Sequence, residues 1–171
     1  MTWQSTIKAK AHEILPWFYD IGTHFSEVEN QSQSLELIKG AAFLRDGIDN
    51  KGLMNNMAHP ALVALVMDFF YAPSSIGSAF PEVFSHEVPQ VTVCLATTTL
   101  QAALDKYIQT GIQQDHQFKY GTYSKIFAGF LDMQHQIDQH PKHAVKTQEL
   151  QAAWASAGKY ETTFHSFIGV Y

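Results

Sequence analysis

The sequence predicts an all-α protein with five to six helices, packed as one orthogonal or bundle-like domain, 1–171, around a central apolar helix. Two observations lead to this prediction. Apolar side chains recur every three to four residues along most of the 171-residue chain, which is the period of a helix. Residues 61–67 are apolar on every side, as expected for a helix that other helices surround.

The first expected helix ends or kinks at Pro16, because proline disrupts a helix interior. Its apolar face consists of Ile7, Ala11, Ile14, Leu15 and Phe18. The polar segment from Tyr19 to Ser34 is typical of a loop. A second helix is expected from near Ser34 to about Asp49, with Ser32 or Ser34 as its cap. Its apolar stripe consists of Leu37, Ala41, Leu44 and Ile48.

The remaining helices have clearer start and stop signals. Pro60 fits the first turn of the third helix, where its missing N–H costs nothing, and His59 fits the cap position before it. The fourth helix is expected to end at Gly111. Its β-branched residues also fit a strand, but its length and the lack of a partner strand favour a helix. The expected ranges are 90–111 for the fourth helix, 122–138 and 146–160 for the next two, and 161–171 for a short docked helix; the connection 72–89 is expected to fold back on the core.

Composition and charge exclude several classes of protein. The 11 basic and 16 acidic residues give a net charge of −5 and form no basic stripe, so we expect neither nucleic-acid nor membrane binding. The apolar run 60–72 is too short to span a bilayer, and the first eight residues lack the apolar core of a signal peptide. Cys94 is the only cysteine, so an intrachain disulfide and a cysteine-based zinc motif are excluded. We expect an intracellular, cytoplasmic protein.

Four residues are candidates for binding a small molecule. Arg45 is the only arginine, and its guanidinium can hold a carboxylate or phosphate in a bidentate fork. The simpler interpretation of Arg45 is a structural ion pair. His59, at the start of a helix, can bind an anion or act as an acid or base, although capping that helix is the simpler interpretation. Tyr107 and Tyr123 lie on the fourth and fifth helices and complete the candidate lining.

Histidines also gather near the end of the fifth helix. His135, Asp138, His140 and His143 fall within nine residues, and the first two share a helical face. The surrounding glutamines and lysine indicate a solvated surface instead, so we expect no metal and no cofactor. The sequence contains no phosphate-binding loop, dinucleotide loop, nucleophile elbow or kinase motif. The aromatic segments 19–25 and 160–171 could line a pocket or a partner surface, although core packing is the simpler interpretation.

Several segments together resemble a known family. These segments are 38–49 with Arg45, His59-Pro60, Asp68-Phe69-Phe70-Tyr71, Phe80-Pro81 with Phe84, Leu104-Asp105-Lys106-Tyr107, and 123–131. In this order they resemble a domain of unknown function that is abundant in mushroom-forming (basidiomycete) fungi. The resemblance covers about residues 35–135. It implies an all-helical domain and supplies no activity or catalytic residue.

The absence of a catalytic motif and the aromatic C-terminal segment favour a helical module that binds a protein partner or self-associates. The alternative is a helical enzyme or small-molecule-binding protein with a pocket between the second, third and fourth helices. That pocket would use Arg45 and His59, since helical bundles host such sites in their cores. The sequence alone leaves open whether the chain is an enzyme.

Overall fold

The structure, a computed structural model, describes residues 3–114 and 120–167. In the described part of the chain the all-α prediction is confirmed, because eight α-helices occur and the only β-type pairing is the isolated bridge between Ile48 and Met54. The expected number of five to six helices is too low. The connection 72–89 contains two short helices that the sequence did not predict, α4 (Ile76–Ala79) and α5 (Pro81–Phe84).

The other helices follow the chain in a simple order. They are α1 (Trp3–Phe18), α2 (Glu27–Ile38), the 3-10 segment η1 (Lys39–Leu44), α3 (Pro60–Val66), the π-helical segment η2 (Met67–Tyr71), α6 (Gln90–Thr110), α7 (Tyr120–Asp138) and α8 (Pro141–Phe167). No described helix has the length and apolar character needed to cross a membrane.

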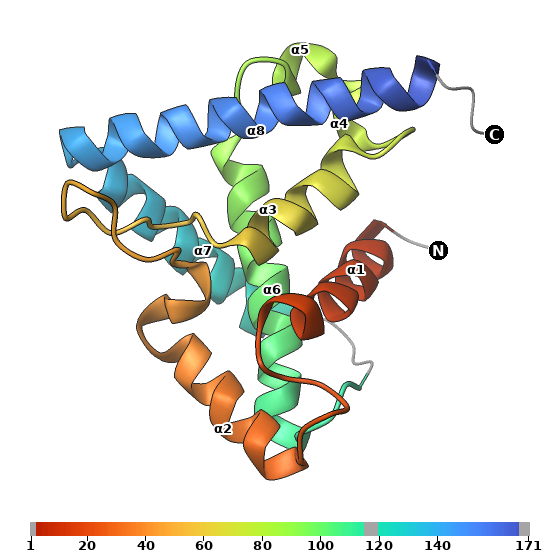
Figure 1. The fold of residues 1–171 in the computed structure, drawn as a ribbon, viewed down its shortest axis with the longest axis vertical. Helices are drawn as coiled ribbons and strands as arrows, with labels where there is room; N and C mark the ends of the chain where they lie inside the picture. Colours follow the sequence, from red (N-terminus) through yellow and green to blue (C-terminus); the bar gives the residue numbers. More distant parts are fainter. Residues whose placement is uncertain (1–2, 115–119, 168–171) are drawn as a thin grey trace.

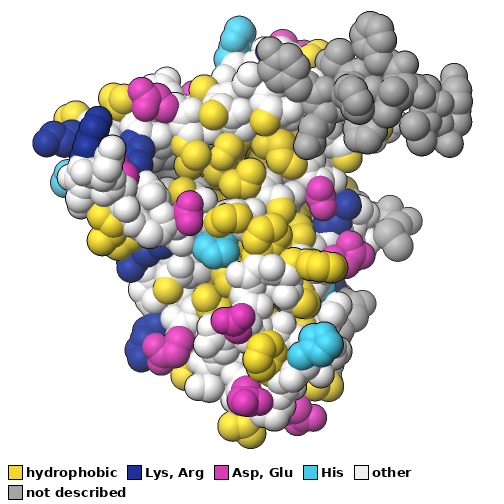
Figure 2. Space-filling model, viewed as in Figure 1, with side chains coloured by type: hydrophobic (Ala, Val, Ile, Leu, Met, Phe, Trp, Pro, Cys, Tyr) yellow, Lys and Arg dark blue, Asp and Glu magenta, His cyan; other side chains and the backbone are white. Residues whose placement is uncertain are grey.

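The central helix is α6, and not the helix after Pro60 as predicted. Figure 1 shows α6 running through the middle of the molecule, with α1, α2, α3 and α7 packed along it and α8 crossing one end. Twelve of its 21 residues are buried. In contrast, Val63, Ala64 and Met67 on the α3 side are only half-buried. Figure 2 shows the corresponding apolar area across the middle of this face.

The polar segment predicted as a loop forms most of α2. The helix begins at Glu27 because Ser26 and Glu29 form a capping box: the Ser26 hydroxyl accepts from the Glu29 N–H, and the Glu29 carboxylate accepts from the Ser26 N–H. Only Tyr19 to Ser26 connects α1 to α2. Phe18, expected in the core, is exposed at the end of α1, which continues only two residues past Pro16.

Arg45 does not lie on a helix, as the predicted second helix required. Gly40 and Ala41 have left-handed backbone angles, with φ of 58° and 56°, and this breaks the helical path after α2. A left-handed alanine costs about 1 kcal/mol, so the surrounding structure must enforce it. The chain then leaves η1 in an extended conformation at Arg45.

The last helix is longer than predicted at both ends. It begins at Pro141 and not near Lys146, and it continues through Phe167, so residues 161–167 extend α8 and do not form a separate helix. Side chains of residues 160–167 and all of 168–171 lie outside the described part, so docking of this segment stays a prediction. Gly158 of α8 lies directly against the ring of Tyr71, leaving no room for a Cβ atom.

A buried asparagine joins α2 to the end of α6. The Asn30 Oδ1 accepts from the Gly22 N–H at 2.9 Å, and its Nδ2 donates to Gly22 O at 2.9 Å and to Gly111 O at 2.8 Å. Gly111 has φ of 72° and ends α6 as predicted. The Asn30 side chain therefore connects the turn between α1 and α2 to Gly111, which lies 81 residues after Asn30 in the sequence.

Candidate functional site

Three exposed aromatic rings lie where α1 turns into α2. We call Trp17, Phe18 and Phe25 the aromatic corner. Trp17 has 85% of its surface exposed, the largest fraction among the exposed hydrophobic side chains of the described residues. Scattered exposed apolar side chains are ordinary, but three large rings within nine residues are typical of a contact surface.

A rigid scaffold holds the aromatic corner outward. Tyr19 and Ile21, between the exposed rings, are buried in the core. The Tyr19 hydroxyl donates to Phe43 O at 2.7 Å, and burial raises the pKa of this phenol far above its ordinary value. Asn30 fixes Gly22 on the other side. The exposed rings are therefore presented by an ordered turn.

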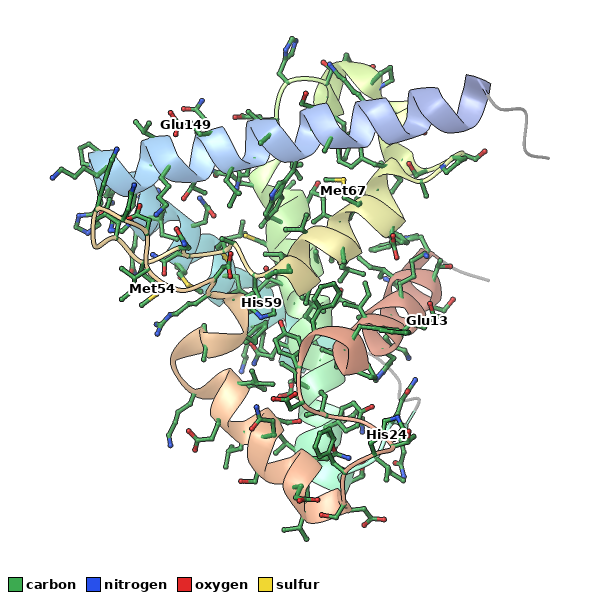
Figure 3. All side chains as sticks on the ribbon, viewed as in Figure 1. Glu13, His24, Met54, His59, Met67 and Glu149 are labelled. Atoms are coloured by element: carbon green, nitrogen blue, oxygen red, sulfur yellow. The ribbon has the colours of Figure 1, made fainter. Side chains whose placement is uncertain are left out.

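The surroundings of the aromatic corner are acidic. Between residues 11 and 30 the chain has four acidic side chains, all exposed, and no lysine or arginine: Glu13, Asp20, Glu27 and Glu29. Figure 3 places Glu13 and His24 at the outer edge of α1 and of the following turn. Hydrogen bonds from Ser26 hold the pKa of Glu29 below its ordinary value, so this side chain is ionised at neutral pH. The carboxyl end of α6, which carries partial negative charge, lies against Glu27.

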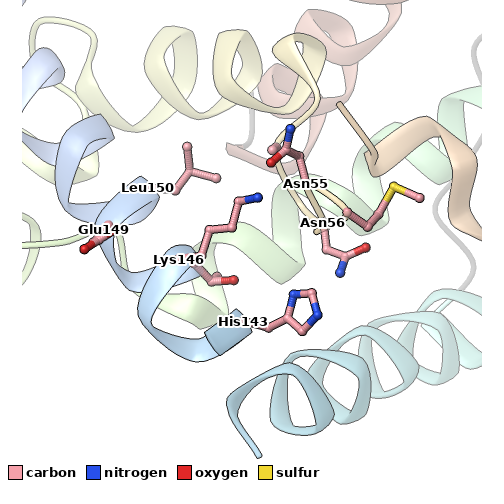
Figure 4. A pocket seen from close by; sticks show the side chains of 9 residues that line it. Asn55, Asn56, His143, Lys146, Glu149 and Leu150 are labelled. Atoms are coloured by element: carbon pink, nitrogen blue, oxygen red, sulfur yellow. The ribbon is translucent and has the colours of Figure 1, made fainter. Parts of the chain in front are cut away.

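A second feature is a cleft between the loop 46–58 and the start of α8. Figure 4 shows this α8 cleft, with Asn55 and Asn56 on one side and His143 and Lys146 on the other. Its volume is about 280 Å³. The lining residues are Met54, Asn55, Asn56, Ala58, His143, Lys146, Thr147, Glu149 and Leu150.

The α8 cleft lacks a free amine for acid–base chemistry. Lys146 Nζ lies 2.5 Å from Asp49 Oδ2, and both side chains are about three-quarters buried. The Asp49 Oδ1 also accepts from the N–H groups of Lys51 and Leu53, each at 2.9 Å. The hydrogen bond from Lys146, followed by the backbone bond from Leu53, lowers the pKa of Asp49 to about 2. This ion pair fixes the loop to α8. The other polar side chains of the cleft are His143, Thr147, Glu149 and the two asparagine amides.

A third feature is a polar pocket on the other side of α8, where α7 ends and α6 begins. Its volume is about 240 Å³, and its lining residues are Glu87, Gln90, Asp138, Ala144, Thr147, Gln148 and Gln151. The Asp138 carboxylate accepts from Gln90 Nε2 at 2.9 Å and from Gln134 Nε2 at 3.2 Å. No lysine, arginine or histidine is among the lining residues.

The structure does not bring Arg45 and His59 together in a pocket lined by both. His59 caps α3 as the simpler interpretation predicted, because its Nδ1 accepts from the Ala61 N–H at 3.2 Å. Its ring stacks on Tyr19 with a centroid separation of 4.6 Å, and burial lowers its pKa. Arg45 is exposed, and no ion pair to Asp46 or Asp49 occurs among the described contacts. Neither side chain lines the α8 cleft or the polar pocket.

Tyr107 and Tyr123 are both buried on facing helices, α6 and α7. Burial raises the pKa of both phenols, that of Tyr123 to about 12, and the nearby Asp105 carboxylate raises it further. Both phenols are therefore protonated at neutral pH. Their role as ligand contacts stays a prediction.

The histidine-rich segment is spread over the end of α7 and the start of α8. His135 lies beside Gln139, with 3.1 Å between the two side-chain nitrogens, and the rings of His140 and His143 are 6.3 Å apart. The described residues contain no group of three or more His, Cys, Asp or Glu side chains that could hold a metal ion. Cys94 is fully buried, and this raises the pKa of its thiol to about 11, as expected for an unreactive cysteine.

Sequence reasoning missed part of each surface. It singled out segment 19–25 but not Trp17, although an aromatic pair directly after Pro16 was a usable signal. It missed the polar pocket entirely. Its polar lining residues come from three separate helices and form no motif, and only the packing of α6, α7 and α8 brings them together.

These observations define the chain as an all-α protein with an exposed aromatic corner and several pockets along its last helix, among them the α8 cleft and the polar pocket. The chain belongs to the family described as a domain of unknown function (DUF6532), which matches residues 1–137. Comparisons with curated proteins and with solved structures give no match. The resemblance to an uncharacterised family is confirmed, whereas abundance in fungi stays an expectation. Helix α8 lies beyond the matched residues.

Proposed function

We propose that this chain is a helical protein-interaction module whose aromatic corner binds a segment of a partner protein. The partner segment combines apolar side chains with lysine or arginine. The observation that carries this proposal is the 85% exposure of Trp17 on an ordered turn between buried Leu15 and Tyr19.

The energy available at the corner is large enough to support binding. A docked tryptophan removes about 150–250 Å² from water, which is worth about 4–6 kcal/mol at about 25 cal/mol/Å². Tryptophan is also among the residues that dominate measured binding energies at protein interfaces. An ordered turn loses little conformational entropy when a partner binds, so more of this energy contributes to affinity.

Charge determines which partner fits. Glu13, Asp20, Glu27 and Glu29 are exposed on the segment that carries the rings, and residues 11–30 contain no lysine or arginine. A basic segment therefore gains attraction, and a second copy of the same acidic segment meets repulsion. The proposal therefore favours a partner protein over self-association through this corner.

The test measures binding of two fluorescent peptides by anisotropy. One is an amphipathic helix of leucine and lysine, and the other is the same peptide with glutamate for lysine. We expect the basic peptide alone to bind, with an affinity that falls as salt is added. W17A should weaken binding at least about tenfold, as expected for an interface hot spot.

W3A is the matched control, because Trp3 is an exposed tryptophan at the other end of the same helix. We expect it to change affinity less than about twofold. Equal binding of both peptides, or unchanged binding by W17A, would contradict the proposal. A dimer in light scattering that W17A dissociates would show self-association through the corner instead.

The alternative function, ligand binding or catalysis by Arg45 and His59 with Tyr107 and Tyr123, has less support. His59 is used as a helix cap, Arg45 is exposed, and both tyrosines are buried. This alternative predicts a small molecule whose binding R45A abolishes without affecting stability.

A further inference from the structure

We propose that the polar pocket between α6, α7 and α8 binds a small hydroxylated organic cation, a molecule that carries a primary amine and several hydroxyl groups. This site is separate from the aromatic corner. The corner is fixed to the end of α6 through Asn30 and Gly111, whereas the pocket includes Gln90 at the start of α6. A helix of 21 residues separates the two by roughly 30 Å.

Two buried amide side chains, Gln151 in the pocket lining and Gln134 bonded to the lining residue Asp138, each have one atom without a hydrogen-bond partner among the described residues. Gln151 lines the pocket and is only 3% exposed, yet its Nε2 donates to no acceptor among the described residues. Gln134 is 1% exposed, and its Oε1 accepts from no described donor, although its Nε2 donates to Asp138. An unmade buried hydrogen bond costs about 1–3 kcal/mol, so the unpaired Gln151 Nε2 in the pocket lining needs an explanation.

The side chains of the pocket select the chemistry of the occupant. Glu87 and Asp138 supply two carboxylates, and no basic side chain lines the pocket to balance them. A cationic amine therefore gains attraction, whereas an anion is repelled. The amides of Gln148 and Gln151 and the hydroxyl of Thr147 pair with groups that both donate and accept, which is what hydroxyl groups do.

Size restricts the occupant further. A volume of about 240 Å³ is below the usual range of about 300–1,000 Å³ for sites of drug-sized ligands. The pocket fits a molecule the size of a single amino sugar and is too small for a nucleotide or a peptide. Its lining is polar, which disfavours an aliphatic amine without hydroxyl groups.

The binding test uses three probes of one ring size: glucosamine, glucose and glucuronate. Each is titrated by calorimetry in phosphate buffer, because the usual amine buffer belongs to the proposed ligand class. We expect glucosamine alone to bind and to raise the melting temperature by about 3 °C near saturation. Absence of binding by all three, as expected if the pocket holds only water, would overturn the proposal, as would equal binding of all three.

Two variants test the assigned residues. E87Q removes one exposed carboxylate, and we expect it to weaken glucosamine binding at least about fivefold. Q151L removes the unpaired amide, and we expect it to abolish binding while the unliganded protein melts at the same or a higher temperature. If Gln151 only stabilised the fold, Q151L would instead lower the melting temperature of the unliganded protein. A lower melting temperature for Q151L together with unchanged binding in E87Q would refute the assignment.

E149Q is the matched control. Glu149 is an exposed carboxylate on α8, the helix of Gln151, but it lines the α8 cleft and not the polar pocket. We expect E149Q to bind glucosamine like the parent protein. If E149Q and E87Q weaken binding equally, the effect comes from net charge, and the pocket is not the site.

Discussion

The two ends of the central helix use buried side-chain amides in opposite ways. At the end of α6, Asn30 makes three hydrogen bonds between 2.8 and 2.9 Å to backbone groups of Gly22 and Gly111. At the start of α6, the equally buried Gln151 and Gln134 each leave one amide atom without a partner. The same chemical group makes three hydrogen bonds that stabilise the fold at one end and has an unpaired atom at the other.

This difference separates structural polar groups from candidate binding groups. A satisfied buried amide rigidifies the protein, and its loss leaves several backbone groups unpaired. An unsatisfied amide reduces stability unless something else contacts it. Removing a buried amide at the end of α6 and removing one at its start should therefore change the free energy of unfolding by different amounts and in different directions.

The largest effect is expected for N30A. Truncation leaves the Gly22 N–H and the Gly111 carbonyl buried without partners, at about 1–3 kcal/mol each, and leaves Gly22 O with only its bond from the Phe25 N–H. We expect the free energy of unfolding to fall by about 3–5 kcal/mol, or about 10 °C in melting temperature. Urea unfolding checks this value. A loss below about 1 kcal/mol would remove the contrast between the two ends.

A smaller effect is expected for G158A, which tests how α8 is attached. The new Cβ atom would collide with the ring of Tyr71, and overpacking of this kind costs about 1–3 kcal/mol. Hydrogen exchange should then show faster exchange in α8 and unchanged exchange in α6. Uniform acceleration throughout the chain would show that α8 is not a separable unit.

G129A provides the comparison for that experiment. Gly129 lies inside α7, and a Cβ atom there meets nothing within 4 Å. Alanine is favoured over glycine in a helix interior by about 1 kcal/mol, so this variant should be slightly more stable than the parent protein. The two glycine substitutions therefore differ in sign.

Substitutions at His59 test its role as the N-cap of α3. H59A removes the acceptor for the Ala61 N–H and the ring stacked on Tyr19, so we expect a loss of about 1 kcal/mol. H59N should recover most of it, because asparagine is a strong cap. Thermal unfolding of both variants, with H24A as an exposed control, makes the comparison. Equal melting temperatures for H59A and H59N would contradict the capping role.

The smallest effect concerns pH and the second attachment of α8. The folded pKa of Asp49, about 2, is below its ordinary value near 3.8, so the folded state binds fewer protons between these values. The stability from the ion pair with Lys146 is therefore present above about pH 4 and is lost as pH falls toward 2. The difference in melting temperature between the parent protein and D49N should be present at pH 7 and shrink by pH 2.5. A difference independent of pH would exclude the ion pair as its cause.

The parts of the fold that sequence predicted are those with local signals. Pro60 and Gly111 mark a helix start and a helix end by their own backbone chemistry, so the third helix began and the fourth ended as predicted. The sequence prediction failed for α2, because Asn30 and its polar neighbours were interpreted as a loop. The partners of Asn30 are backbone groups, one of them 81 residues away, and no local pattern reveals them.

The candidate sites were harder to predict for the same reason. Arg45 was placed on a helix because nothing in the sequence forces Ala41 into a left-handed conformation; the surrounding packing does. The polar pocket needs three helices that are adjacent only after folding. The aromatic corner was partly predictable, since segment 19–25 was considered as a pocket or partner surface, although core packing was the simpler interpretation. The exposed position of Trp17 depends on which face of α1 meets α6.

The three tryptophans make the intrinsic fluorescence of the protein sensitive to two different structural changes. Trp154 lies on α8 and is buried, Trp17 is almost fully in water at the aromatic corner, and Trp3 is half exposed. Indole emission moves to shorter wavelength in apolar surroundings, so lifting α8 would shift the light of Trp154 to the red, whereas a partner at the corner would shift that of Trp17 to the blue. The colour of the native fluorescence therefore distinguishes loss of the last helix from docking at the opposite end without any added dye.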